Sequence, residues 1–61
     1  MNEEMIIHQI ASDLHIRLGQ VRTALDLFAS GNTIPFIARY RKEATGTLDE
    51  QQLRQIKEQY E

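Results

Sequence analysis

The residues best suited to binding chemistry are four consecutive positions near the middle of the chain, Arg39-Tyr40-Arg41-Lys42. Arginine and lysine contact phosphate oxygens, and aromatic rings between them can stack on bases. Residues 31–45 hold these three bases against the single acid Glu43, whereas the segments on either side each carry four acids and two bases. The net charge of −2 argues against a surface devoted wholly to nucleic acid. The sequence therefore predicts a local basic spot on an acidic domain.

Patterns typical of catalysis or metal binding are missing from the sequence. It has no cysteine, no glycine-rich phosphate loop, no Gly-x-Ser-x-Gly motif and no His-x-x-x-His spacing. His8 and His15 are seven residues apart, about 10 Å along a helix, so both cannot hold one ion. The adjacent carboxylates of Asp49 and Glu50 diverge on a helix. We therefore expect no enzymatic activity, no cofactor and no metal site in this chain.

The basic run belongs to a predicted helix that begins soon after Gly31 and is closed by Gly46. Gly31 can take the left-handed conformation that ends a preceding helix, and Thr33 with Pro35 can start the next one. This helix is expected over about residues 34 to 43 or 44. More than half of its circumference is apolar on a helical wheel, through Ile34, Phe36, Ile37, Ala38 and Tyr40. We therefore expect it to lie centrally, with the other helices packed around it.

Arg41 falls inside this apolar arc, between Ile37 and Ala38. Two explanations stay open. The side chain either extends outward to solvent, or it pairs with a carboxylate in a partly buried position. Candidate partners for the second explanation are Asp26, Glu43, Asp49 and a carboxylate outside these residues.

Three further helices flank the central one. The first is expected over residues 3–14 after the N-cap Asn2, and the second is expected to end at Gly31. In the second, Arg22 and Asp26 are spaced to pair across one turn. The last is expected to begin with a capping box of Thr47 and Glu50 and carries the thin apolar stripe Leu53, Ile56, Tyr60.

These patterns predict an all-α fold of four short helices in a compact, helix-turn-helix-like array. The third helix is expected at the centre and the last one projecting. Since the last helix has no C-capping glycine or asparagine before Glu61, we expect it to be truncated and to continue into more protein.

Length and composition allow one small domain. The chain has 61 residues, of which 41% are hydrophobic and 26% charged, as in ordinary globular domains. Its first residues are acidic, unlike a secretory signal, and no apolar run approaches the roughly 20 residues that span a membrane. We expect a cytoplasmic protein without membrane contact.

The segment Pro35-Phe36-Ile37-Ala38-Arg39-Tyr40-Arg41-Lys42-Glu43, followed by Thr45-Gly46 and Leu48-Asp49, resembles the N-terminal signature of the Tex family. These are bacterial transcription accessory proteins, similar to a eukaryotic transcription elongation factor. The match of this motif is long, gapless and specific, and the periodicity of the flanking segments agrees with it from about Ile6 to Tyr60. Thr47 stands where the family more often has Gly, and Ala29 and Ser30 stand where acidic residues are expected.

The resemblance implies that residues 1–61 are the N-terminal helical domain of a larger protein. Such a parent has further helical segments, a ribonuclease-H-like domain, a helix-hairpin-helix region and an RNA-binding OB-fold domain. The implied partners are these remaining domains, nucleic acid through the parent, and the transcription machinery.

Two hypotheses for the domain follow. The first is that the domain is a non-catalytic module that docks on the rest of the protein. Its structural and docking residues are expected to be Gly31, Pro35, Phe36, Ile37, Tyr40 and Arg41. The alternative is sequence-independent binding of DNA or RNA by Arg39 and Lys42, with Arg41 nearby. The first residues of the helix after the turn, Ile34 to Ile37, offer no side-chain hydrogen bonds to base edges. We therefore expect no sequence-specific reading by that helix.

Overall fold

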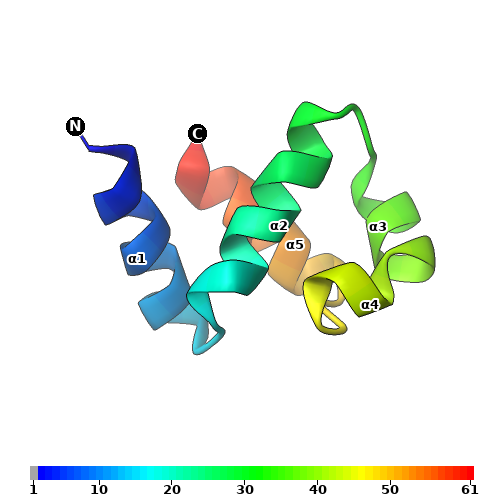
Figure 1. Ribbon diagram of the computed structural model, residues 1–61, viewed down its shortest axis with the longest axis horizontal. Helices are drawn as coiled ribbons and strands as arrows, with labels where there is room; N and C mark the ends of the chain where they lie inside the picture. Colours follow the sequence, from blue (N-terminus) through cyan, green and yellow to red (C-terminus); the bar gives the residue numbers. More distant parts are fainter. Residues whose placement is uncertain (1) are drawn as a thin grey trace.

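The computed structural model describes residues 2–61, and every regular element in this range is a helix (Figure 1). The helices are α1 (Glu3–Leu14), α2 (Leu18–Ala29), α3 (Ile34–Tyr40), α4 (Lys42–Thr45) and α5 (Glu50–Tyr60). The all-α class is thus confirmed, but there are five helices in this range and not four. The expected third helix is divided at Arg41, whose φ of −125° and ψ of 32° lie outside helical geometry.

The break at Arg41 turns α4 back onto α2. Gln20 in α2 uses its side-chain amide to donate hydrogen bonds to the carbonyls of Thr45, at 2.9 Å, and Gly46, at 3.3 Å. The backbone of Gly46 is left-handed, with φ 69°, and a Cβ there would lie only 2.6 Å from Gln20 Nε2. The left-handed backbone therefore favours glycine at position 46, and a side chain there would also displace the end of the Gln20 side chain from its hydrogen bonds.

The centre of the molecule is formed by α2 and α5, not by α3. In Figure 1, α2 and α5 lie between α1 at one end and α3 with α4 at the other. The fully enclosed core residues come from all parts of the chain: Ile7, Ile10, Ala11, Val21, Ala24, Ile37, Leu48, Leu53 and Ile56. Only Ile37 in this list belongs to α3, because a seven-residue helix at the edge buries one narrow face. The expectation of a central third helix was wrong.

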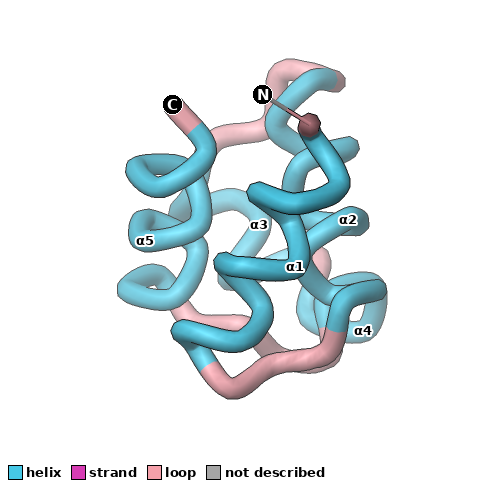
Figure 2. Tube along the Cα trace, turned by 90° about the vertical axis from the view of Figure 1, so that its left-hand side faces the viewer, coloured by secondary structure: helices cyan, strands magenta, loops and turns pink. Residues whose placement is uncertain are grey.

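The last helix does not project from the array. Leu53 and Ile56 are both 0% exposed, and α5 packs against α1, α2 and α3. Figure 2 shows α1 and α5 side by side, with the two ends of the chain on the same side. There the Tyr60 hydroxyl donates a hydrogen bond to the Glu3 carboxylate. The thin apolar stripe of α5 is therefore sufficient to place it inside the fold.

The start of α5 lies two residues later than the sequence predicted. Asp49 is the N-cap: its carboxylate accepts from the Gln52 amide at 2.8 Å, and the Gln52 side chain accepts from the Asp49 amide at 3.0 Å. Thr47 does not cap, because its backbone is left-handed, with φ 67°. Leu48, 2% exposed, fills the core just before the helix begins. The pair Thr47 and Glu50 therefore forms no capping box.

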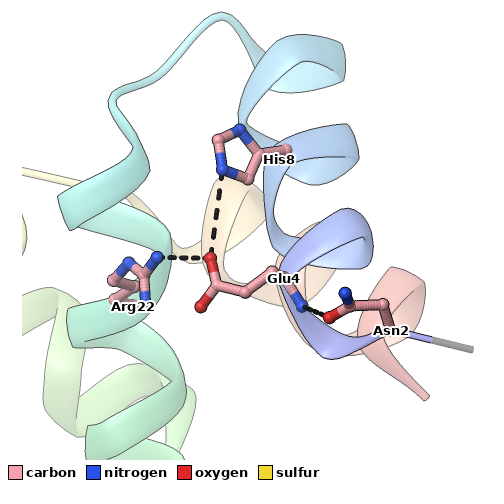
Figure 3. A network of polar contacts seen from close by, with 4 residues as sticks. All are labelled: Asn2, Glu4, His8 and Arg22. Carbon is pink, nitrogen blue, oxygen red and sulfur yellow. Dashed lines mark hydrogen bonds and ion pairs between the residues drawn. The ribbon is translucent and has the colours of Figure 1, made fainter.

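Polar contacts hold α1 against its neighbours. Asn2 caps α1 as expected, since its side chain accepts from the Glu4 amide at 2.9 Å. Arg22 pairs with Glu4 at 2.5 Å and so joins α2 to α1, whereas the pairing of Arg22 with Asp26 is not observed. Figure 3 shows Glu4 between Arg22 and His8, whose Nε2 lies 3.9 Å from the carboxylate. Contact between helices thus replaces the expected contact within α2.

The helix-turn-helix-like arrangement stays a prediction. α3 packs mainly on α5 and, through the break, on α4, while α2 packs on α1, α4 and α5. Close packing between α2 and α3, on which the comparison with a helix-turn-helix depended, is not a main contact of this fold.

The burial of Ile37 predicts a measurable cost for losing a single methylene group. Ile37→Val should lower the free energy of unfolding by about 0.5–1.5 kcal/mol, because the surrounding core leaves a small cavity. Urea unfolding followed by circular dichroism measures this. Met5→Ala is the control: Met5 is 67% exposed, so its change should stay within about 0.5 kcal/mol. An equal loss in both variants would contradict the assignment of Ile37 to the core.

The contact between Tyr60 and Glu3 predicts a pH effect. The hydrogen bond to the Glu3 carboxylate, followed by partial burial and the carboxylate charge, raises the pKa of Tyr60 above the usual 10.0. Because the folded-state pKa is raised, the stabilisation is present below pH 10.0 and is lost as the pH rises through the raised value.

The chain has two tyrosines, so a Tyr40→Phe background isolates Tyr60 in an absorbance titration of tyrosinate. In that background Glu3→Ala should return the pKa of Tyr60 towards its ordinary value. Glu4→Ala, which removes the pair with Arg22 instead, should leave the Tyr60 titration in place. No difference between the two variants would show that Glu3 does not act on Tyr60.

Candidate docking surface

α3 is fixed at the edge of the fold by its first residues. Thr33 caps the helix, since its hydroxyl accepts from the Phe36 amide at 3.3 Å. Pro35 lies in the first turn, where its missing N–H leaves no hydrogen bond unmade. Gly31 has a φ of 91°, which lets the chain leave α2 and turn towards α3. These local choices present α3 at the end of the molecule opposite α1 (Figure 1).

Two aromatic side chains of α3 point away from the core. Tyr40 is 60% exposed and Phe36 is 38% exposed, whereas Ile37 between them is 0% exposed. The two rings lie one helical turn apart, with centroids separated by 5.1 Å and planes inclined at 45°. The sequence placed Phe36 and Tyr40 on the apolar arc of a central helix; both are exposed because, within residues 2–61, no other helix covers that side of α3. The result is an exposed aromatic pair.

An arginine lies over each ring. The Arg39 guanidinium carbon is 5.6 Å from the centroid of Tyr40, and that of Arg41 is 5.1 Å from the centroid of Phe36. Such cation–π contacts contribute about 0.5–1 kcal/mol at exposed sites. Arg41 also donates from Nη1 to the carbonyl of Tyr40 at 3.4 Å. The two arginines therefore lie on the aromatic pair and are not directed away from it.

Arg41 is exposed, as in the first of its two explanations, but its side chain lies over the Phe36 ring and does not extend freely into solvent. Within residues 2–61 it forms no ion pair with Asp26, Glu43 or Asp49. The ion pairs within residues 2–61 are those of Glu4 with Arg22 and with His8.

We call the side chains of Phe36, Arg39, Tyr40, Arg41 and Lys42 the α3 patch. Lys42 and the arginines border a shallow recess that runs along the break between α3 and α4, lined by residues 39–44. The structure thus brings together the three basic residues that the sequence singled out. It places Gly31 and Pro35 in the framework of α3 and Ile37 in the core.

Gln20 was not among the candidate residues, although it determines the orientation of α4. Its carbonyl oxygen accepts from the Arg17 amide at 2.8 Å at the start of α2, while its amide group donates to the carbonyls at the end of α4. A glutamine three residues after an N-cap is a known local signal. The second role, across 25 positions of sequence, has no local signal.

A second, more apolar groove lies between α1 and α5, lined by Met5, Ile6, Gln9, Ile10 and Gln59. α1, which supplies most of its lining, lies at the opposite end of the long axis from α3 (Figure 1). Within residues 2–61, no three His, Asp or Glu side chains are close enough to hold a metal ion together. In the same range, none of the helices has the length and apolar character needed to cross a bilayer.

The fold and the α3 patch define a small all-helical domain with an exposed aromatic and basic surface. The family model described as "Tex-like protein N-terminal domain" matches residues 4–61, and the chain belongs to this family. The resemblance inferred from the motif around Pro35 is therefore confirmed.

Three relatives illustrate the likeness. "Protein tex" of Bordetella pertussis is 53% identical over 51 residues, which cover 84% of this chain and 6% of that protein. "Transcriptional accessory protein Tex" of Neisseria gonorrhoeae is 51% identical over 49 residues, covering 80% of this chain and 6% of that protein. "Protein YhgF" of Escherichia coli is 55% identical over 47 residues, or 77% of this chain and 6% of that protein. No solved structure matches the chain significantly. The chain spans about 6–8% of the length of the relatives it matches.

Proposed function

We propose that this domain is a non-catalytic docking module of a Tex-like transcription accessory protein, which binds nucleic acid and supports transcription in the cytoplasm. In this proposal the α3 patch packs on the remaining domains of the same protein. The observation that carries it is the exposed aromatic pair of Phe36 and Tyr40 on a helix that is held rigidly at one end of the fold.

The energetics of the aromatic pair support docking. Single exposed apolar residues are common, but two adjacent rings on one short helix form a concentrated apolar surface. Phe36 is 38% and Tyr40 60% exposed, so covering both rings removes about as much apolar surface as burying one whole side chain and contributes about 1.5–3 kcal/mol. Because α3 is already ordered by its cap and by Ile37, little additional conformational entropy is lost on docking. The short span of this chain in its relatives indicates where a docking partner lies, namely in the rest of the protein.

The absence of catalysis is part of the same proposal. It is supported by three carboxylates that act as a helix cap or as contacts between helices. Asp49 caps α5, Glu3 accepts from Tyr60, and Glu4 binds Arg22. Each of these carboxylates has a structural role that explains its position.

Docking predicts slower amide hydrogen exchange in α3 within the full-length protein than in residues 1–61 alone. The expected difference is about tenfold or more, since covering a large aromatic residue contributes at least about 1.4 kcal/mol. Tyr40→Ala should remove most of this difference and leave the fold of the isolated domain intact, because Tyr40 is 60% exposed. Mass spectrometry of exchanged peptides measures both.

Met5→Ala is the matched control for Tyr40→Ala, since Met5 is similarly exposed, at 67%, but belongs to α1. It should leave the exchange of α3 unchanged. Equal exchange of α3 in the isolated domain and in the full-length protein would refute docking through this surface.

A second candidate function is direct, sequence-independent binding of DNA or RNA by Arg39 and Lys42. It is favoured by the exposure of both residues beside the recess and by their lack of an acidic partner within residues 2–61. Phosphate contacts of this kind are weak and strongly dependent on salt.

This second function predicts a fluorescence-anisotropy signal with short single- and double-stranded DNA and RNA at low salt, which weakens as salt is raised. Arg39→Glu combined with Lys42→Glu should abolish it. Arg54→Glu combined with Lys57→Glu introduces the same change of charge on α5 and is the control. Retained binding by the first double variant would exclude the α3 patch as the contact.

A further inference from the structure

We propose that the surface on which the α3 patch docks is acidic. Carboxylates of Asp or Glu in the remaining domains would receive the guanidinium groups of Arg39 and Arg41, while apolar side chains cover the aromatic pair. This inference rests on the proposed docking function and adds the chemistry of the partner surface.

The orientation of the two arginines carries the inference. Each guanidinium lies over an aromatic ring, at 5.6 Å for Arg39 and 5.1 Å for Arg41. A guanidinium has five N–H donors in its own plane, and its cation–π attraction to a ring does not use them in hydrogen bonds to an acceptor. Arg41 uses one of them, on the Tyr40 carbonyl, and no protein acceptor for Arg39 is found within residues 2–61. A carboxylate matches such an edge through two parallel hydrogen bonds.

Charge complementarity points to the same partner. The α3 patch has three bases, and Glu43 is the only acid in residues 31–45. Elsewhere the chain has eight acids and four bases. The patch is thus a positive area on a negative domain. A partner surface with negative charge would attract this area and fix how the two surfaces are oriented.

Docking would also take water away from the guanidinium groups. Loss of hydration is unfavourable for a cation unless a carboxylate or another acceptor replaces the water. An apolar partner surface would cover Phe36 and Tyr40 but leave the edges of Arg39 and Arg41 without acceptors. An acidic surface with apolar side chains satisfies both requirements.

A nucleic acid satisfies these observations less well. A guanidinium already lies over one face of each ring, and the planes of the two rings are inclined at 45°, so the pair is not a set of open, parallel platforms for bases. Binding of RNA or DNA at the patch is therefore an outcome that the experiment must distinguish.

Carbodiimide coupling of the full-length protein tests the proposal, because this reagent joins an amine to a carboxylate only where the two are in contact. Lys42 supplies one amine, and Arg39→Lys or Arg41→Lys supplies another without changing the charge. Mass spectrometry of the digested protein should find these amines linked to Asp or Glu outside residues 1–61. Lys57 of α5, which lies over the ring of Phe28 in α2, is the control and should form no such link. Links confined to Glu43 or other acids of residues 1–61 would overturn the acidic partner.

Hydrogen exchange separates failure of this inference from failure of docking itself. If α3 is protected in the full-length protein but no carboxylate is coupled, docking stands and the acidic partner is wrong. If α3 gains protection only when RNA or DNA is added, the patch binds nucleic acid and both proposals are overturned. Arg39→Glu with Arg41→Glu should reduce protection of α3 about tenfold, as expected for losing paired charges at an interface. Unchanged protection in that variant would contradict the role of the arginines.

Discussion

The contact between the Gln20 side chain and the end of α4 is the constraint on which the α3 patch depends. The two carbonyls that it binds, of Thr45 and Gly46, are those that a short helix leaves without partners. By binding them, Gln20 connects the end of α4 to α2, an arrangement that goes together with the turn of the chain at Arg41. The buried Thr45 supports this turn, since its hydroxyl donates to the Arg41 carbonyl at 3.2 Å and accepts from the Leu48 amide at 3.3 Å. A continuous helix over the same residues would carry Arg41 and Lys42 to other positions.

The small size of the core explains why the aromatic pair is outside it. α2 and α5 occupy the centre, and both approach α1, so the aliphatic residues of three helices already fill the interior. α3 adds Ile37 to that interior and has no helix on its other side. A chain of 61 residues buries a smaller fraction of its surface than a larger domain does. The exposure of Phe36 and Tyr40 is thus a consequence of how few elements are available to cover α3.

Local signals in the sequence predicted several features correctly. Asn2 caps α1, and Gly31 and Gly46 both take left-handed conformations, because these properties depend on one residue and its neighbours. The start of α5 shows the limit of such signals. Both Thr47 with Glu50 and Asp49 with Gln52 have the spacing of a capping box, and burial of Leu48 selects the second.

The break at Arg41 goes together with the contact of Gln20, which is distant in sequence. Periodicity placed Phe36, Ile37 and Tyr40 on one wide apolar arc of the helix. It contains no information on which part of that arc another helix covers, and only Ile37 is buried.

The stacking of arginines on the aromatic pair is physically suited to a surface that is exposed before docking and covered afterwards. In the isolated domain, the guanidinium groups shield part of each ring from water and keep the area charged, which lowers its tendency to associate with unrelated apolar surfaces. In the proposed docking, the rings would provide the apolar contact area. The guanidinium groups would orient the partner, because they bind a carboxylate well only in their own plane. A patch of two rings alone would bind with little discrimination. In the proposed docking the arginines would lose hydration when they are covered, so a surface without carboxylates would be disfavoured and a partner of the matching charge preferred.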